Sequence, residues 1–135
     1  MAQIITPYLT IRGAAEAIAF YQKAFGATEN MRMPAEDGKR LLHASLSIRG
    51  GTLMLSDEFP EHSGTLAPTP EKPTSVTVAL ALDTPAEVDA VFKQAVSVGA
   101  NGFMPPADMF WGDRFAMLDD PFGHRWMLNA PLKKA

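Results

Sequence analysis

Short runs of the sequence alternate apolar with polar residues, which is the period of a half-buried β-strand. Near the N-terminus, Thr6, Tyr8 and Thr10 fall on one side of an extended chain, and Leu9 and Ile11 fall on the other. We expect this run to form a strand with one buried face. Six further strands are predicted at residues 28–33, 41–48, 52–57, 101–104, 114–118 and 125–129.

Residues 41–48 show this alternation most clearly. The apolar positions are Leu42, Ala44, Leu46 and Ile48, and the polar positions are His43, Ser45 and Ser47. We therefore predict that His43 lies on the polar face of its strand. Turns are expected before this strand at Asp37-Gly38 and after it at Gly50-Gly51.

Two other segments have the period of an amphipathic helix. In residues 14–25 the apolar positions fall three to four apart, and Gly26 is a natural stop. The second helix is predicted to begin at Thr84-Pro85, where Glu87 completes a capping box, and to end at Gly99.

The two halves of the chain repeat each other. Under a shift of 71 residues, segment 6–24 matches segment 77–95; under a shift of 73, Gly26 falls on Gly99 and Met54 on Met127. Each half is therefore predicted to be a βαβββ module. We expect one α+β domain with module one at 1–58, an extended proline-rich linker at 59–75 and module two at 76–135. Its mixed sheets would curl around a cup, with the helices outside.

Composition limits the function. The 135 residues are 47% apolar and 20% charged, with a net charge of −3 and no basic run, which argues against nucleic acid and anionic membranes as partners. The absence of cysteine excludes disulfides, thiolate metal sites and a cysteine nucleophile. With neither a signal-peptide pattern nor an apolar run long enough to span a membrane, we expect a cytoplasmic protein.

Three segments carry a family resemblance: PYLTIRGAAEAIAFYQKAFGA, HASLSIRGGTLMLSD and FWGDRFAMLDDPFGHRWML. They resemble the PhnB-like branch of the vicinal-oxygen-chelate superfamily, which includes glyoxalase, bleomycin-resistance and dioxygenase proteins. The resemblance implies a homodimer whose cup commonly holds a divalent metal, although bleomycin-binding members bind none. Because such a fold serves many chemistries, the site residues must decide the function.

The resemblance also points to four positions for metal ligands. Metal-bearing relatives place a His on the first strand and a Glu on the last strand of a module, and here those positions are Thr6, Met54, Thr77 and Met127. Hydroxyl and thioether groups are poor ligands for Zn²⁺ or Mg²⁺. We therefore predict no metal ligands and no cofactor, with a non-standard divalent metal site as the alternative.

Histidine offers the main candidate for catalysis. For His43 three roles are open. It could act as a general base or contact a ligand, it could bind a metal as the only imidazole ligand, or it could be a hydrogen-bonded strand residue without such a role. Tyr8 could donate its hydroxyl to a ligand or only fill space. His124 is expected to stabilise the turn at residues 120–123, and His62 to be exposed in the linker.

The remaining candidates would line the cup and bind a ligand. They are Tyr8, Thr10, His43, Met54, Thr77, Trp111, Phe115, Met117, Arg125 and Met127. The methionines would form a soft apolar floor or belong only to the core. Arg125 would either clamp an anion or join a surface salt bridge. Trp111 would either cap the ligand from a loop or anchor that loop by being buried, and Asp113 could pair with Arg114.

These residues support two functions. The first is a small-molecule-binding protein without a metal, favoured by the missing ligands and the methionines. The second is a glyoxalase-like lyase, transferase or dioxygenase with a non-standard metal site that includes His43. A metal-free enzyme with His43 as base and Arg125 as its oxyanion partner is a third hypothesis. Motifs for nucleotide phosphates and for a nucleophilic serine are absent.

Overall fold

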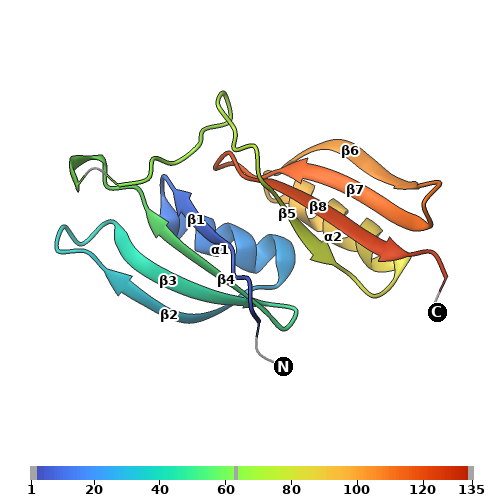
Figure 1. Cartoon of the computed structure of the whole chain (residues 1–135), viewed down its shortest axis with the longest axis horizontal. Helices are drawn as coiled ribbons and strands as arrows, with labels where there is room; N and C mark the ends of the chain where they lie inside the picture. Colours follow the sequence, from blue (N-terminus) through green and yellow to red (C-terminus); the bar gives the residue numbers. More distant parts are fainter. Residues whose placement is uncertain (1–2, 63, 134–135) are drawn as a thin grey trace. The chain divides into compact units, whose positions relative to one another are not determined.

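A computed structural model describes residues 3–62 and 64–133, and it confirms two βαβββ modules (Figure 1). The chain divides between Thr69 and Pro70, inside the predicted linker, into two compact units that we call module one and module two. The linker begins with a single turn of 3₁₀-helix, η1 (Pro60–His62). In the described part of the chain, no helix has the length and apolar character needed to cross a membrane.

Module one contains a four-stranded mixed sheet and one helix. Its elements are β1 (Tyr8–Ile11), α1 (Ala14–Phe25), β2 (Thr28–Pro34), β3 (Leu41–Ile48) and β4 (Gly51–Asp57). The strands are ordered β1-β4-β3-β2, with β1 parallel to β4 and the other pairs antiparallel. This order brings the first and last strands of the module side by side, although the helix and two strands separate them in sequence.

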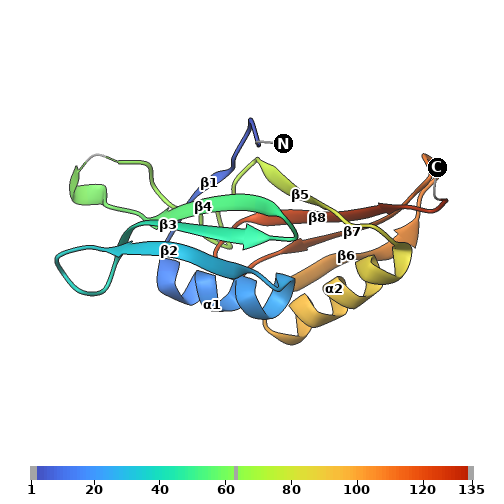
Figure 2. The same cartoon turned by 90° about the horizontal axis from the view of Figure 1, so that it is seen from below.

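The helix α1 covers one face of this sheet and leaves the other face free of helix (Figure 2). The predicted apolar positions Leu9 and Ile11 are buried on the covered face, together with Leu46 and Leu55. Their burial against the apolar side of α1 forms the core of the module. For β1, and for β3 from Ala44 onward, the alternation therefore predicted correctly which side is polar and helix-free.

Module two repeats this arrangement. Its elements are β5 (Thr77–Ala81), α2 (Pro85–Ser97), β6 (Asn101–Asp108), β7 (Asp113–Asp119) and β8 (Arg125–Pro131), with strand order β5-β8-β7-β6. The predicted capping box is confirmed: the Thr84 side chain accepts a hydrogen bond from the Glu87 amide, and the Glu87 carboxylate accepts one from the Thr84 amide. Trp126 and Leu128 are fully buried on the side covered by α2.

Three local predictions were wrong. The hairpin after β3 turns at Arg49-Gly50, both with positive φ, so that Gly51 already begins β4. Leu41 is buried and Leu42 half exposed, because the β2–β3 register shifts between Met33 and Pro34 and breaks the alternation there.

The third error concerns the length of β6. This strand continues through Pro105 and Pro106 to Asp108, whereas the predicted strand ends at residue 104. Proline lacks a backbone N–H and is tolerated in a sheet only at an edge or a bulge. Because β6 is the edge strand and its register shifts on either side of Met104, the prolines interrupt no interior ladder.

Candidate ligand-binding faces

The helix-free face of module one is built by side chains that alternate with its core. Across the sheet, the pairing places Tyr8 beside Met54, Met54 beside Ser45, and Ser45 beside Met31. This row combines a phenol, a hydroxyl and two thioethers. Thr10 and Ser56 form the next pair along β1 and β4. On β1, β3 and β4 the described residues of this face include no Lys, Arg, Asp or Glu.

Two of the predicted site residues on this face touch each other. The Tyr8 hydroxyl lies 2.8 Å from His43 Nδ1, and the two rings stack with their centroids 5.5 Å apart. Tyr8 is half exposed, and His43 is intermediate in burial. The contact fixes the orientation of the imidazole and directs its Nε2 away from Tyr8. His43 is thus a hydrogen-bonded strand residue, which was one of the roles predicted for it.

A pocket opens beside this pair. It has a volume of about 360 Å³, and its lining residues come from β1, β4 and the segment after β4: Tyr8, Thr10, Ser56, Asp57, Phe59, Gly64 and Thr65. Two aromatic and three hydroxyl-bearing residues belong to this lining, together with the acidic residue Asp57. Such a lining suits a small ligand that offers both an apolar surface and a hydrogen-bonding group.

The helix-free face of module two is more apolar. Met104, Met117 and Met127 form one row across β6, β7 and β8, and Ala79 continues it on β5. The row has the same place in the module as the row of Met54 in module one. Thioether side chains adapt to irregular shapes, so this row forms a soft apolar surface. Thr77 lies on the same face, paired with Arg125.

The predicted anion clamp already has a partner. Asp119 accepts two hydrogen bonds from Arg125, at 2.7 Å from Nε and 3.1 Å from Nη2, and the two residues are paired in register across β7 and β8. The guanidinium carbon also lies 4.3 Å from the centre of the Phe103 ring. Hydrogen bonding to Asp119 raises the pKa of Arg125 above its usual value. The salt-bridge alternative for Arg125 is therefore confirmed.

Trp111 lies at the tip of the hairpin between β6 and β7. It is half exposed and meets the rings of Phe110 and Phe115 edge to face. The alternative of a loop anchored by a buried Trp111 was wrong, and the fully buried tryptophan of this module is Trp126. Phe110 is almost completely exposed. The tip thus presents two aromatic rings at the end of the helix-free face.

The expected pairing of Asp113 with Arg114 is also wrong. Neighbouring residues of a strand point to opposite faces. Arg114 instead donates hydrogen bonds to Asp89 of α2 and to Asp108 of β6, each at 2.8 Å. Asp113 lies on the opposite face of the sheet, the face that carries Phe115.

The other two histidines lie where the sequence predicted. His124 is buried after the turn at residues 120–123, and its amide donates a hydrogen bond to the Asp120 carboxylate. That carboxylate also accepts hydrogen bonds from the Phe122 amide and the Trp126 indole. His62 is exposed at the end of η1.

The donor set does not fit a divalent metal. At the positions where the family resemblance implies metal ligands, the chain has Thr6, Met54, Thr77 and Met127. The structure places Thr6 just before β1 and not on the first strand, as the sequence analysis expected. Within residues 3–62 and 64–133, no three His, Cys, Asp or Glu side chains are grouped so that they could hold a metal ion. Zn²⁺ and Mg²⁺ need imidazole, thiolate or carboxylate ligands. We therefore assign no step of any reaction to such a metal.

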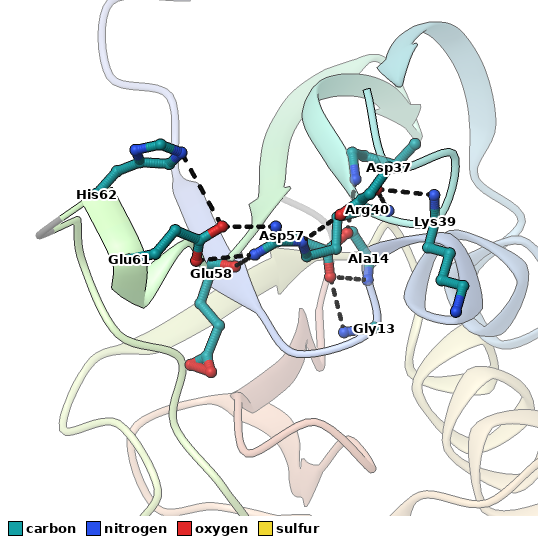
Figure 3. Close-up of polar contacts among 10 residues, drawn as sticks. Gly13, Ala14, Asp37, Lys39, Arg40, Asp57, Glu58, Glu61 and His62 are labelled. Atoms are coloured by element: carbon teal, nitrogen blue, oxygen red, sulfur yellow. Dashed lines mark hydrogen bonds and ion pairs between the residues drawn. The ribbon is translucent and has the colours of Figure 1, made fainter. Parts of the chain in front are cut away.

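A charged cluster lies apart from these positions, around Arg40 (Figure 3). Arg40 bonds Asp37 through Nε at 2.7 Å and Glu61 through Nη2 at 2.6 Å, and its guanidinium carbon lies 4.3 Å from the centre of the Phe59 ring. Hydrogen bonding to Arg40 lowers the pKa of Glu61 to about 2. This cluster joins η1 to the turn before β3.

Sequence reasoning missed Phe103, Met104 and Asp119 as members of the module-two face. Their placement depends on the register of β6 against β7 and of β7 against β8, and the register shifts twice within β6. The one available signal was the strand alternation, which puts Asp119 on the side of Met117.

Comparison with known proteins gives the same picture of the fold. A model of the Glyoxalase/Bleomycin resistance protein/Dioxygenase superfamily matches residues 4–128. The uncharacterized protein Mb0911c of Mycobacterium bovis is 43% identical over 132 residues, covering 96% of this chain and 84% of that protein.

Two solved structures extend the comparison. The crystal structure of protein PA1353 from Pseudomonas aeruginosa is 28% identical with a TM-score of 0.75, covering 98% of this chain and all of that one. A PhnB protein from Bacillus cereus has the same fold, with 24% identity, a TM-score of 0.71 and coverage of 97% and 100%. The family expected from the three sequence segments is thus confirmed.

Proposed function

Because the chain belongs to the Glyoxalase/Bleomycin resistance protein/Dioxygenase superfamily, we propose that it is a small-molecule-binding protein that holds an apolar ligand without a divalent metal. One feature carries the proposal: at the positions where the family resemblance implies metal ligands, both modules have threonine and methionine. A site of this family that lacks metal-ligating side chains can still bind a small molecule on its surface, but it has no metal ion to activate that molecule.

The chemistry of the helix-free faces supports an apolar ligand. Met104, Met117 and Met127 offer a row of thioethers, and Phe115 and Trp111 extend it with aromatic rings. Burying a ligand against this surface removes apolar area from water, which contributes roughly 25 cal/mol per Å² before the costs of association. A flat uncharged aromatic compound fits this row best.

Thermal unfolding in the presence of such compounds tests the proposal. A ligand at 100 times its dissociation constant stabilises the folded state by about 2.7 kcal/mol, which raises Tm by several degrees. The variant Met127→Gln should abolish most of this rise, because it places an amide in the middle of the row. Met109→Gln, at the hairpin and outside the row, is the matched control. Equal responses of the two variants would contradict the proposal.

The contact between Tyr8 and His43 favours a second candidate, which is metal-free acid–base catalysis on module one. In that case turnover of a small carbonyl compound would resist chelators and fall about 100-fold or more in both Tyr8→Phe and His43→Gln. Arg125 supports this candidate poorly as an oxyanion partner, since Asp119 already occupies its guanidinium. Turnover that is unchanged in His43→Gln would exclude it.

We further propose that the protein forms a homodimer, as the family resemblance implies, and that it is cytoplasmic, as expected from the lack of a signal-peptide pattern and of a membrane-length apolar run. Light scattering at micromolar concentration tests the dimer. A mass of one chain, 14.6 kDa, would contradict it.

A further inference from the structure

Building on the proposed function, we infer that Asp119 is a specificity-determining residue that makes the helix-free face of module two select uncharged ligands and reject anions. It does so by occupying Arg125. Among the described residues of β5 to β8, Arg125 is the only Lys or Arg on this face.

The pair is held in one geometry from two sides. Asp119 engages Arg125 edge-on through two hydrogen bonds, and the Phe103 ring covers the guanidinium at 4.3 Å. A two-point contact of this kind fixes both orientation and distance. Because Asp119 and Arg125 are also paired in register on neighbouring strands, their backbones already stand side by side. A ligand carboxylate would have to displace a preorganised one.

The charges on this face disfavour anions further. Asp119 and Arg125 neutralise each other, and Asp113 adds a second carboxylate at the other end of β7. An incoming anion would lose hydration without finding an unpaired cation, and burial of an unpaired charge is costly. An uncharged ligand meets no such penalty beside the methionine row.

Module one leads to the same selection by a different route. On β1, β3 and β4 the described residues of its helix-free face offer hydroxyls, one thioether, a phenol and an imidazole, but no Lys or Arg. Neutral donors and acceptors of this kind suit a carbonyl, hydroxyl or amide group. Among the described residues of these strands, neither face supplies an unpaired guanidinium or ammonium group to recognise a carboxylate or a phosphonate.

Two probes that share one ring system and have polar groups of similar size but different charge test the inference. These are 2-naphthamide, which is neutral, and 2-naphthoate, which carries the same ring on a carboxylate. The wild-type protein should bind 2-naphthamide about tenfold or more tightly than 2-naphthoate, measured by calorimetric titration at fixed salt. Asp119→Asn keeps the shape of the side chain and exposes the charge of Arg125. It should raise the affinity for 2-naphthoate about tenfold and change that for 2-naphthamide less than twofold.

Two controls assign the effect to this pair. Asp108→Asn removes a carboxylate from the pair with Arg114 on the helix-covered side, and it should keep the wild-type ratio of affinities. The double variant Asp119→Asn/Arg125→Gln should lose the gain in 2-naphthoate binding. Asp119→Ser is the second replacement at this position if the asparagine variant does not fold.

The outcomes separate this inference from the proposed function. If 2-naphthoate binding does not rise in Asp119→Asn or Asp119→Ser, the inference is overturned, whatever the wild-type protein binds. If it rises although the wild-type protein binds no 2-naphthamide, charge selection by Asp119 is supported and the proposed binding of apolar ligands loses its support. A wild-type protein that prefers 2-naphthoate overturns the inference outright.

Discussion

Asp57 is a buried carboxylate that holds three backbone amides of module one. Its Oδ1 accepts hydrogen bonds from the Gly13 and Ala14 amides at 2.9 and 3.0 Å, and its Oδ2 accepts one from the Leu41 amide at 2.7 Å (Figure 3). The N-cap residue of α1 is Gly13, which has no side chain that could cap the helix. Asp57 therefore performs the capping from the end of β4 and ties helix, sheet and turn together.

Asp57→Asn should consequently destabilise the fold. Its amide nitrogen can only donate, so at least one buried amide would face another donor, at a cost of about 2–3 kcal/mol. Urea unfolding should show a lower midpoint with an unchanged slope. The control is Asp37→Asn, whose carboxylate is exposed. A loss at Asp57 no larger than that at Asp37 would contradict the assigned role.

Glu61 provides a prediction about pH. Its pKa is lowered to about 2 from the ordinary 4.5, first by the hydrogen bond from Arg40. A carboxyl whose pKa is lowered in the folded state contributes stability that is present above pH 4.5 and lost as the pH falls through about 2. In Arg40→Gln, NMR titration should find the pKa of Glu61 moved most of the way back to 4.5. Arg32→Gln should raise the pKa of Glu29 instead and leave Glu61 unchanged.

At the scale of single elements, α2 depends on its capping box. The Thr84 hydroxyl oxygen accepts a hydrogen bond from the Glu87 amide at 3.2 Å, and Pro85 occupies the first turn of the helix. Thr84→Ala should lower the free energy of unfolding by about 1 kcal/mol. Ser97→Ala, at the other end of α2, loses only a hydrogen bond to the carbonyl of Gln94 and should cost less than about 0.5 kcal/mol. Equal losses in thermal unfolding would show that the capping box is not what stabilises this helix.

The elements were largely predictable from the sequence because their signals are local. Alternation placed Leu9 and Ile11 in the core, and glycine or capping residues marked the ends of both helices. The second half of β6, residues 105–108, escaped prediction because proline usually ends a strand. Only the edge position of β6, a property of the whole sheet, permits Pro105 and Pro106 there.

The contacts between elements could not be predicted in the same way. Tyr8 and His43 are 35 residues apart, and their pairing follows from the register of β1, β4 and β3. The same holds for Asp119 and Arg125, whose ion pair follows from the register of β7 against β8. Local patterns specify which face a side chain occupies, but not which neighbour it meets.

At the scale of the whole molecule, a repeated module has the fold of its family, while the positions where the family resemblance implies metal ligands have hydroxyl and thioether groups. The two modules carry equivalent methionine rows, at Met31 and Met54 in one and at Met104 and Met127 in the other. The cup that we predicted from the sequence stays a prediction. What each module shows by itself is a helix-free face without a divalent-metal donor set in the described residues.

Metal content tests the central claim most directly. Protein purified without a metal-affinity tag should contain less than about a tenth of an equivalent of Zn, Ni, Mn or Fe by plasma mass spectrometry, because hydroxyl and thioether donors hold these ions poorly. Its Tm should rise with uncharged aromatic compounds and be insensitive to chelators. One equivalent of any of these metals, lost in His43→Ala together with an activity, would contradict the account.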